Sequence, residues 1–291
     1  MSLKGAVVGC GHMGALHARK LLAHPGVILV GVVDPAGVPE DLPELARLPT
    51  DLDFAVVAVP TARHVAISLP LAQAGLPLLM EKPVAASVQE GQALAQNAAI
   101  SVNHIERWNP TLAALPAGFR PRYLRAERLS PWGARGTDVD VVLDLMIHDL
   151  DLVLHLTGEP VHDVRAVGVP VRTRGVDIAE VWLETAGGAV ATLTASRVSR
   201  KPVRQLRAVG TDGYFSLDLR GRTAARVNYQ DDELAAQPVP VPPGDALEAV
   251  HRDFLAAVRG ERSYPVPVGE ALAVVALAER VTAQAQGRSW A

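Results

Sequence analysis

Apolar residues follow two different patterns in the two parts of the chain. Over the first hundred residues, short apolar runs alternate with segments in which apolar residues recur every three or four positions. The first pattern is typical of buried parallel strands and the second of helices. We expect strands at 3–8, 27–33, 54–59, 76–80 and 100–102, and helices at 15–23, 62–74 and 88–99. This alternation predicts an α/β fold with a doubly wound parallel sheet.

The part of the chain after about residue 105 has a different pattern. One long, mostly apolar helix is expected at 139–156, with Asp138 or Asp140 as its N-cap and Gly158 near its end. Runs with strand spacing follow at 164–171, 178–185, 189–196, 205–210, 214–219 and 224–229. Turns at 187–188 and 211–213 contain glycine and indicate hairpins, so an α+β domain with a mostly antiparallel sheet is predicted.

A proline-rich stretch at 238–243 is typical of a linker, and two closing helices are expected after it at 246–259 and 269–286. We therefore divide the chain into two predicted domains, 1–105 and 106–291. The closing helices fall in the second of these domains.

A glycine-rich turn directly follows the first expected strand. Gly9, Gly11 and Gly14 have the spacing Gly-x-Gly-x-x-Gly, and a helix follows at once. In such a turn the first glycine permits the tight bend, the second lets the backbone approach a pyrophosphate, and the third lets the helix pack on the sheet. The helix N-terminus offers N–H groups and a positive dipole end to phosphates. Domain 1–105 is predicted to be a dinucleotide-binding Rossmann domain, and a turn that binds nothing is the alternative.

Asp34 ends the second expected strand and indicates which dinucleotide binds. A carboxylate about 20 residues after the last glycine can accept hydrogen bonds from both hydroxyls of the adenosine ribose. It would also repel the additional phosphate of NADP, and no Arg or Lys occurs at 35–38 to bind that phosphate. The sequence therefore predicts NAD as the cofactor.

The composition is that of a globular protein and gives no sign of a nucleic-acid or membrane partner. Hydrophobic residues make up 49% of the 291 positions and charged residues 20%, and the formal net charge is only −3. The single cysteine, Cys10, excludes an intramolecular disulfide. No signal peptide precedes the first strand, and no apolar run reaches the ~18–20 residues that span a bilayer, so a cytoplasmic location is expected.

Polar residues share one stripe of the long expected helix. At about 100° per residue, Asp144, His148, Asp151 and His155 lie on one side, and the other residues are apolar except Asp149. Asp144 can orient the imidazole four residues on and raise its basicity, which suits a general base. A buried structural network and a metal site of His and Asp ligands are the alternatives.

Lys82 follows the fourth expected strand. It lies at a carboxyl end, where open α/β sheets bind their ligands, and Pro83 restricts the backbone before it. The alternative is a solvated lysine in a surface loop.

A polar stretch at 103–110 lies at the predicted junction between the domains. It contains Arg107 and Asn109 and could line a ligand cleft or make interdomain contacts. Arg125, Arg128 and Arg135 follow, and such a cluster is expected if the substrate carries phosphates.

Together these motifs resemble the glucose–fructose oxidoreductase, inositol dehydrogenase and MocA superfamily. The resemblance spans the chain and implies an NAD-dependent dehydrogenase that acts on CH–OH groups, with Lys82, Asp144 and His148 as catalytic residues and no metal. The matching motifs are Gly9-Cys10-Gly11-His12-Met13-Gly14, Asp34, Val57-Ala58-Val59-Pro60-Thr61 with His64, Glu81-Lys82-Pro83, and 144–148. Cofactor contacts are implied from Gly9, Gly11, His12, Met13, Gly14, Asp34, Pro60, Thr61, His64, Glu81 and Lys82.

Two segments, 107–110 and 143–151, resemble the nucleotide-sugar branch of that superfamily. Its members oxidise the 3-hydroxyl of UDP-N-acetylglucosamine or a related uronic acid. This resemblance implies substrate contacts from Arg107, Asn109, Arg135 and His148, and a homodimer or homotetramer formed through the C-terminal sheet. An inositol-type, other polyol or monosaccharide dehydrogenase and a non-catalytic dinucleotide-binding sensor are the alternatives.

Overall fold

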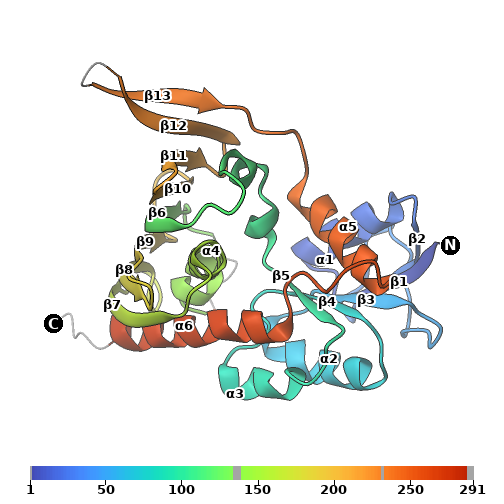
Figure 1. Cartoon of the computed structure of the whole chain (residues 1–291). Helices are drawn as coiled ribbons and strands as arrows, with labels where there is room; N and C mark the ends of the chain where they lie inside the picture. The colour runs from blue at the N-terminus through green and yellow to red at the C-terminus, as the bar shows by residue number, and fades with distance from the viewer. Residues whose placement is uncertain (1, 134–138, 231–232, 287–291) are drawn as a thin grey trace. The chain divides into compact units, whose positions relative to one another are not determined.

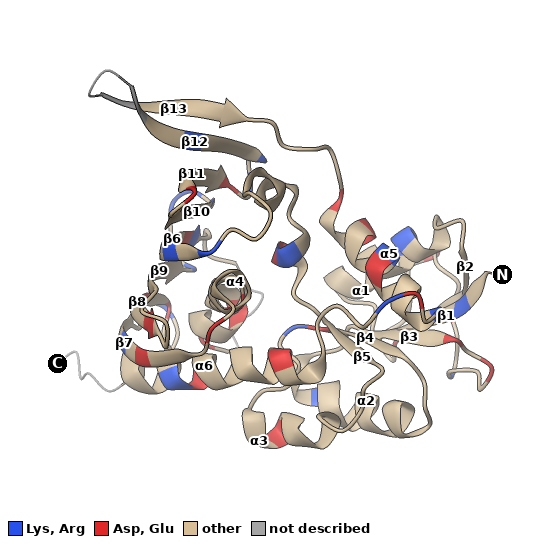
Figure 2. Cartoon of the chain, in the orientation of Figure 1, with Lys and Arg blue, Asp and Glu red and all other residues tan. Residues whose placement is uncertain are grey.

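The computed structural model describes residues 2–133, 139–230 and 233–286, and its contacts divide the chain into two units. The first unit comprises Met1–His104 and Leu247–Val275, and the second comprises Ile105–Ala246 and Ala276–Ala291. Acidic and basic residues are interspersed over the elements of both units (Figure 2). Among the described residues, no helix combines the length and the apolar character that crossing a bilayer requires.

The first unit is built on a five-stranded parallel sheet with the strand order β2-β1-β3-β4-β5 (Figure 1). Its strands are β1 (Leu3–Val8), β2 (Val27–Val33), β3 (Phe54–Val57), β4 (Leu78–Glu81) and β5 (Ile100–Asn103). Its helices are α1 (His12–Leu22), α2 (His64–Gln73), the short α3 (Val88–Gly91), α5 (Ala246–Val258) and the start of α6 (Val268–Gln286). Strands β3, β4 and β5 are buried along their whole length, as uninterrupted apolar runs predict for a sheet covered on both faces.

The closing helices do not all belong to the second unit, as the sequence division at residue 105 assumed. Helix α5 and the chain up to Val275 pack in the first unit. Phe254 of α5 meets Phe54 of β3 edge to face, with ring centroids 5.8 Å apart, and the amide of Val102 donates to the carbonyl oxygen of Val266. The apolar face of α5 thus completes the core of the first unit, and a contiguous boundary could not anticipate this return of the chain.

The helix expected at 88–99 is shorter in the structure. Helix α3 ends at Gly91, and a 3-10 turn, η2 (Gln92–Leu94), follows it. A Cβ at Gly91 would collide with the side chain of Leu272 on α6, so close packing of the two helices requires glycine there.

The second unit contains an eight-stranded sheet with the strand order β13-β12-β11-β10-β6-β9-β8-β7. Its strands are β6 (Pro121–Leu129), β7 (Val161–Val169), β8 (Ile178–Thr185), β9 (Val190–Ser196), β10 (Val203–Gly210), β11 (Gly213–Asp218), β12 (Thr223–Gln230) and β13 (Glu233–Val239). Every neighbouring pair is antiparallel except β6 and β9, and both expected glycine turns join hairpin strands. The fold class predicted from the sequence is confirmed.

Two strands of this sheet were not expected. Strand β6 lies in the middle of the sheet, but charged residues interrupt its apolar alternation, because Arg128 is buried in place of an apolar residue. Strand β13 continues through Pro238, the first residue of the expected linker. Proline is tolerated there because β13 is an edge strand.

The long helix of the second unit contains a wide turn. Helix α4 (Ile147–Thr157) packs on the sheet and ends at Gly158, which has φ +71°. It is preceded by a π-helical turn, η5 (Val142–Met146), in place of regular α-helix. Asp140 does not cap the first turn, because its carboxylate accepts hydrogen bonds from the Val176 amide and Gln286. Asp138 lies outside the described residues.

Candidate active site

The glycine turn has the geometry that the motif predicts. Gly9 has φ +93°, and a Cβ there would approach the carbonyl oxygen of Ala58 to 2.5 Å. A Cβ at Gly14 would collide with the carbonyl oxygen of Gly9, whereas a Cβ at Gly11 would meet nothing within 4 Å. Gly11 is also the N-cap of α1 and has no side chain to bind the first amides of that helix. The start of α1 thus has no side-chain cap and has open space at Gly11, with His12 exposed and Met13 half-buried next in the chain.

Asp34 holds the glycine turn from the end of β2. One oxygen of its carboxylate accepts the Cys10 amide at 2.6 Å, and the other accepts the Ala36 amide at 2.8 Å. Each carboxylate oxygen has a second lone pair, so these bonds leave acceptor capacity for ribose hydroxyls. Asp34 is half-buried beside the turn, and its contact with the ribose stays a prediction.

His64 connects the loops that follow β3 and β4. Its Nδ1 lies 2.7 Å from the carbonyl oxygen of Pro83, and its Nε2 lies 2.9 Å from that of Val59. Burial lowers the pKa of His64 below its ordinary value, against the effect of both carbonyls. Pro60 is exposed and precedes the 3-10 turn η1 (Thr61–Arg63). Thr61 is half-buried at the start of η1, and His64 follows this turn directly. His64 therefore holds the backbone next to Lys82, and a direct cofactor contact from it stays a prediction.

Glu81 points into the core of the first unit. Its Oε1 lies 2.8 Å from Nε2 of His17 and accepts Nδ2 of Asn103 at 2.7 Å. Burial alone would raise the pKa of Glu81, but these hydrogen bonds and the charge of Lys82 lower it below the ordinary value. An ionised, buried carboxylate thus directly precedes the half-buried Lys82, and the two are joined by chain connectivity and by charge. The expected cofactor contact from Glu81 also stays a prediction.

In the second unit, Asp144 and His148 are half-buried on consecutive turns of the helix. Asp144 lies in the π-helical turn η5 and His148 in the first turn of α4. The regular 100° spacing behind the expected stripe does not hold across η5, because a π turn takes more residues than an α turn. Wide turns of this kind occur often at functional sites. The catalytic roles of both residues stay predictions.

Two of the residues expected to bind substrate are engaged inside the second unit. Arg107 makes a bidentate ion pair with Asp151 of α4, with its Nη2 2.7 Å and its Nε 3.0 Å from the carboxylate. The Asn109 amide donates to Glu106 and to the carbonyl oxygen of Leu219, each at 2.9 Å, and its oxygen accepts the Thr111 hydroxyl. Asp151 thus belongs to a structural pair, as one alternative for the stripe predicts. Arg135 lies outside the described residues.

The two described members of the expected arginine cluster, Arg125 and Arg128, have different partners. Arg125 is exposed on β6 and pairs with Glu127, whereas Arg128 is buried between Glu106 and Asp149. Arg128 binds the Asp149 carboxylate through two bonds of 2.8 Å and reaches Glu106 at 2.8 Å. These carboxylates raise the pKa of Arg128 despite its burial, and its charge lowers the pKa of Glu106 against the effect of burial. Arg128, Glu106 and Asp149, here called the Arg128 cluster, fix helix α4 next to His148.

Comparison with known proteins assigns the chain to a family. Residues 3–104 match the oxidoreductase family with an NAD-binding Rossmann fold, and residues 118–216 match the GFO/IDH/MocA C-terminal domain. The chain is 38% identical over 283 residues to UDP-N-acetylglucosamine 3-dehydrogenase of Acidithiobacillus ferrooxidans, which covers 89% of this chain and 90% of that protein. The chain belongs to the Gfo/Idh/MocA oxidoreductase family. It is an NAD-binding dehydrogenase, and the prediction of NAD as cofactor is confirmed.

Solved structures of this family share the fold along nearly the whole chain. The UDP-N-acetylglucosamine 3-dehydrogenase from Acidithiobacillus ferrooxidans has a TM-score of 0.90 at 35% identity and covers 98% of both chains. A scyllo-inositol dehydrogenase from Lactobacillus casei with bound NAD(H) and scyllo-inositol has a TM-score of 0.77 at 16% identity and covers 98% of this chain and 97% of that one, which shows the fold alone. Among the curated relatives, the scyllo-inositol 2-dehydrogenase (NAD(+)) of Bacillus subtilis is 26% identical over 246 residues, 72% of this chain and 71% of that protein.

The first unit of this Gfo/Idh/MocA protein fits NAD on its own geometry. Open space next to Gly11 and the uncapped amides of α1 suit the pyrophosphate, and the Asp34 carboxylate suits the ribose. NAD supplies the acceptor for hydride when it is bound, and the protein supplies position and proton handling.

Sequence reasoning missed the buried partners of the motif residues. His17 lies among the buried Gly14, Ala15, Ala18 and Leu21 of α1, and His251 among the buried Leu247, Val250, Phe254 and Leu255 of α5. A lone histidine on an apolar helical face was the available signal. The sequence signal for burial of Glu106 and Arg128 was weaker, because neither residue lies in a regular apolar pattern.

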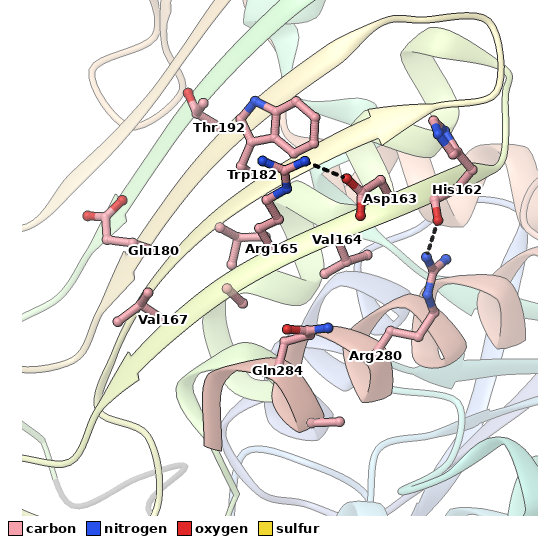
Figure 3. A pocket seen from close by; sticks show the side chains of 13 residues that line it. His162, Asp163, Val164, Arg165, Val167, Glu180, Trp182, Thr192, Arg280 and Gln284 are labelled. Atoms are coloured by element: carbon pink, nitrogen blue, oxygen red, sulfur yellow. Dashed lines mark hydrogen bonds and ion pairs between the residues drawn. The ribbon is translucent and has the colours of Figure 1, made fainter. Parts of the chain in front are cut away.

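One hollow on the described surface of the second unit is lined by none of the predicted site residues. It has a volume of about 1060 Å³ and lies over β7, β8 and the end of α6 (Figure 3). Arg165 covers the ring of Trp182 there, with 4.9 Å from guanidinium carbon to ring centroid, and Arg280 donates to the carbonyl oxygen of His162. None of the residues with predicted chemistry lines it, so we attach no catalytic role to it.

Proposed function

We propose that this protein oxidises the 3-hydroxyl of a UDP-N-acetylhexosamine, with NAD as the hydride acceptor. The observation that carries the proposal is the 38% identity to a UDP-N-acetylglucosamine 3-dehydrogenase, which extends over about nine-tenths of both proteins. The cradle at Gly11 and Asp34 supports the cofactor half of the reaction.

The chain's own residues would handle the proton of the reacting hydroxyl. His148 would remove it while the hydrogen on the same carbon leaves as hydride, so that a ketone forms. Asp144 would hold the imidazole in position. The ammonium group of Lys82 would donate a hydrogen bond to the same oxygen and stabilise its developing negative charge. Arg107, Asn109 and Arg135 would contribute to substrate binding in this proposal.

An inositol-type polyol dehydrogenase is the second proposed function. Curated inositol dehydrogenases match the chain at lower identity, for example 26% for the enzyme of Bacillus subtilis. The same three catalytic residues would serve either alcohol. A homodimer or homotetramer formed through the C-terminal sheet and a cytoplasmic location are further proposals.

The deciding experiment measures NADH formation with UDP-N-acetylglucosamine, UDP-N-acetylgalactosamine, myo-inositol and scyllo-inositol. The product is then reduced with borodeuteride, and mass spectrometry and NMR locate the deuterium. Deuterium at C3 of the UDP-sugar is the expected result. Turnover of the inositols alone would support the second function, and silence with all four together with measured NAD binding would favour a dinucleotide sensor.

A further inference from the structure

A chain of three buried titratable side chains lies behind Lys82 in the first unit. Nε2 of His17 lies 2.8 Å from Oε1 of Glu81, and Nδ1 of His17 lies 2.7 Å from Nε2 of His251. His17 and His251 are 0% and 1% exposed, and Glu81 is 8% exposed. The residues come from α1, β4 and α5, so segments far apart in sequence meet at one polar line through the core. We call it the Glu81–His17–His251 chain.

The hydrogen bond between His17 and Glu81 has a defined direction. Glu81 is ionised and can only accept, so Nε2 of His17 must carry a proton and donate to it. Nδ1 of His17 faces Nε2 of His251, so one of these two nitrogens donates and the other accepts. Either direction keeps the Nε2–H of His17 on Glu81 while His251 holds the other side of the ring.

His251 is held in the neutral form by its surroundings. Burial lowers its pKa well below the ordinary value, and the positive charges of His17, His24 and Lys20 lower it further. Lys20 and His24 belong to α1 and the turn after it, and Lys20 pairs with Glu248 of α5 at 2.9 Å. Neutral His251 carries one N–H and one ring lone pair, so it can be either partner of Nδ1 of His17.

The chain ends at the residue next to Lys82. The charge of Lys82 lowers the pKa of Glu81, and this attraction is mutual. A carboxylate that lost the His17 donor would be left with Asn103 alone and would hold its charge less well in the core. Both ring nitrogens of His17 are held, Nε2 by Glu81 and Nδ1 by His251, so loss of His251 leaves the imidazole able to turn away from Glu81.

We propose that His251 is a positioning residue of the dehydrogenase: through His17 it keeps Glu81 ionised and fixed beside Lys82, and so maintains the ammonium form of that lysine. This inference rests on the catalytic role of Lys82 in the proposed function. The network also joins α1, β4 and α5, so the test must separate an effect on Lys82 from simple loosening of the core.

The test labels the folded enzyme with acetic anhydride at a series of pH values. Mass spectrometry of the peptide that contains Lys82 then gives its labelling rate at each pH. His251→Phe removes the partner of Nδ1 of His17 while keeping a ring of similar size. If the His17 ring then turns away, Glu81 loses that donor and takes up a proton in the core. Loss of the counter-charge moves the midpoint of the labelling profile to lower pH, by an amount that raises the rate at about pH 8 roughly tenfold. A change in accessibility alters the plateau rate and leaves the midpoint in place. The measurement requires no substrate, so it stands even if the sugar assignment fails.

Two variants serve as controls. His251→Gln keeps an N–H donor and is expected to retain the wild-type midpoint. Phe254→Leu loosens the same helix at the contact with Phe54 and leaves the three polar residues intact, so its midpoint should also be unchanged. An unchanged profile in His251→Phe, or an equal shift in Phe254→Leu, would overturn the proposal.

Activity gives a second readout once the substrate is identified. His251→Phe should lower kcat about tenfold while the Kd for NAD changes less than about twofold. Should His251→Phe fail to fold, ¹⁵N NMR of the wild-type imidazoles decides instead. His17 must carry its proton on Nε2 at neutral pH, and a neutral His17 protonated on Nδ1 would contradict the inference.

Discussion

Both units bury a polar cluster next to a residue with predicted chemistry, and the two clusters are built from different side chains. In the first unit the Glu81–His17–His251 chain adjoins Lys82, and in the second the Arg128 cluster adjoins His148. Histidine can gain or lose a proton near neutral pH, whereas arginine stays charged. Burial keeps His251 neutral in the first cluster, so acidification acts against that cluster. In the second cluster Arg128 and Glu106 keep their charges near neutral pH, and burial raises the pKa of Asp149 against the effect of Arg128. The comparison predicts different failures for the two units.

The largest loss of stability is expected from breaking the Arg128 cluster. Arg128→Met leaves buried Asp149 without its guanidinium partner and Glu106 with the more distant Arg204, 3.6 Å away. Removing one partner of a buried ion pair typically costs about 3–5 kcal/mol of unfolding free energy. Urea denaturation at neutral pH measures this change in unfolding free energy. Arg125→Met on the same strand is the matched control, because Arg125 is exposed and should contribute less than about 1 kcal/mol. Equal losses in the two variants would show that the buried cluster is not a stabilising unit.

The second-largest effect is expected on turnover, from replacing Lys82 while the Glu81–His17–His251 chain is kept. Lys82→Met removes the donor to the substrate oxygen but leaves Glu81, His17 and His251 in place. Turnover should fall about 10²–10³-fold, as for loss of an oxyanion donor, with little change in NAD affinity. Steady-state kinetics and NAD titration measure the two quantities, and the exposed Lys201→Met is the control. A parallel loss of NAD affinity would make Lys82 a cofactor contact and not a catalytic one.

The same contrast explains what the sequence could and could not predict. The parallel sheet, the glycine turn and Asp34 follow from local patterns, because apolar runs and glycine spacing depend on near neighbours in the chain. The antiparallel domain also followed from its hairpin turns. Strand β6 was missed because Arg128 occupies a core position, and its buried partners come from distant segments.

Long-range pairing also limited the prediction of the site. The stripe on the long helix rested on a uniform α-helical period, which the π turn at Val142–Met146 interrupts. The substrate role of Arg107 came from the family resemblance and stays a prediction, and its pair with Asp151 was missed because that residue lies on α4, far along the chain. His17 and His251 are more than two hundred positions apart, and nothing in either helix alone indicates that they meet.

A smaller effect concerns cofactor choice, which the comparison assigns to the first unit alone. Asp34→Asn keeps an oxygen acceptor for the Cys10 amide but removes the negative charge that repels the additional phosphate of NADP. The ratio of kcat/KM for NAD to that for NADP should fall about tenfold. Asp51→Asn, an exposed carboxylate paired with Lys4, should leave the ratio unchanged. If Asp34→Asn leaves it unchanged too, the ribose contact is wrong.

The smallest effect tests whether only the first cluster responds to pH. The pKa of His251 lies well below its ordinary value in the folded protein, so on acidification the unfolded chain binds a proton that the folded protein does not. Stability due to neutral His251 is therefore complete above the unfolded pKa of about 6.5 and declines as the pH falls below it. Between about pH 7 and pH 5.5 this histidine should account for a loss of about 1 kcal/mol.

Hydrogen exchange of α1 and α5 peptides at both pH values measures that loss in the first unit. His251→Gln does not titrate, so its loss should be about 1 kcal/mol smaller than that of the wild type. Glu106→Gln is the counterpart in the second unit: the pKa of Glu106 is already lowered, so the wild-type carboxylate stays ionised across this range. Its substitution should change stability by the same amount at both pH values, measured by exchange in α4. A pH-dependent difference for Glu106→Gln, or none for His251→Gln, would remove the distinction between a histidine cluster that responds to protons and an arginine cluster that does not.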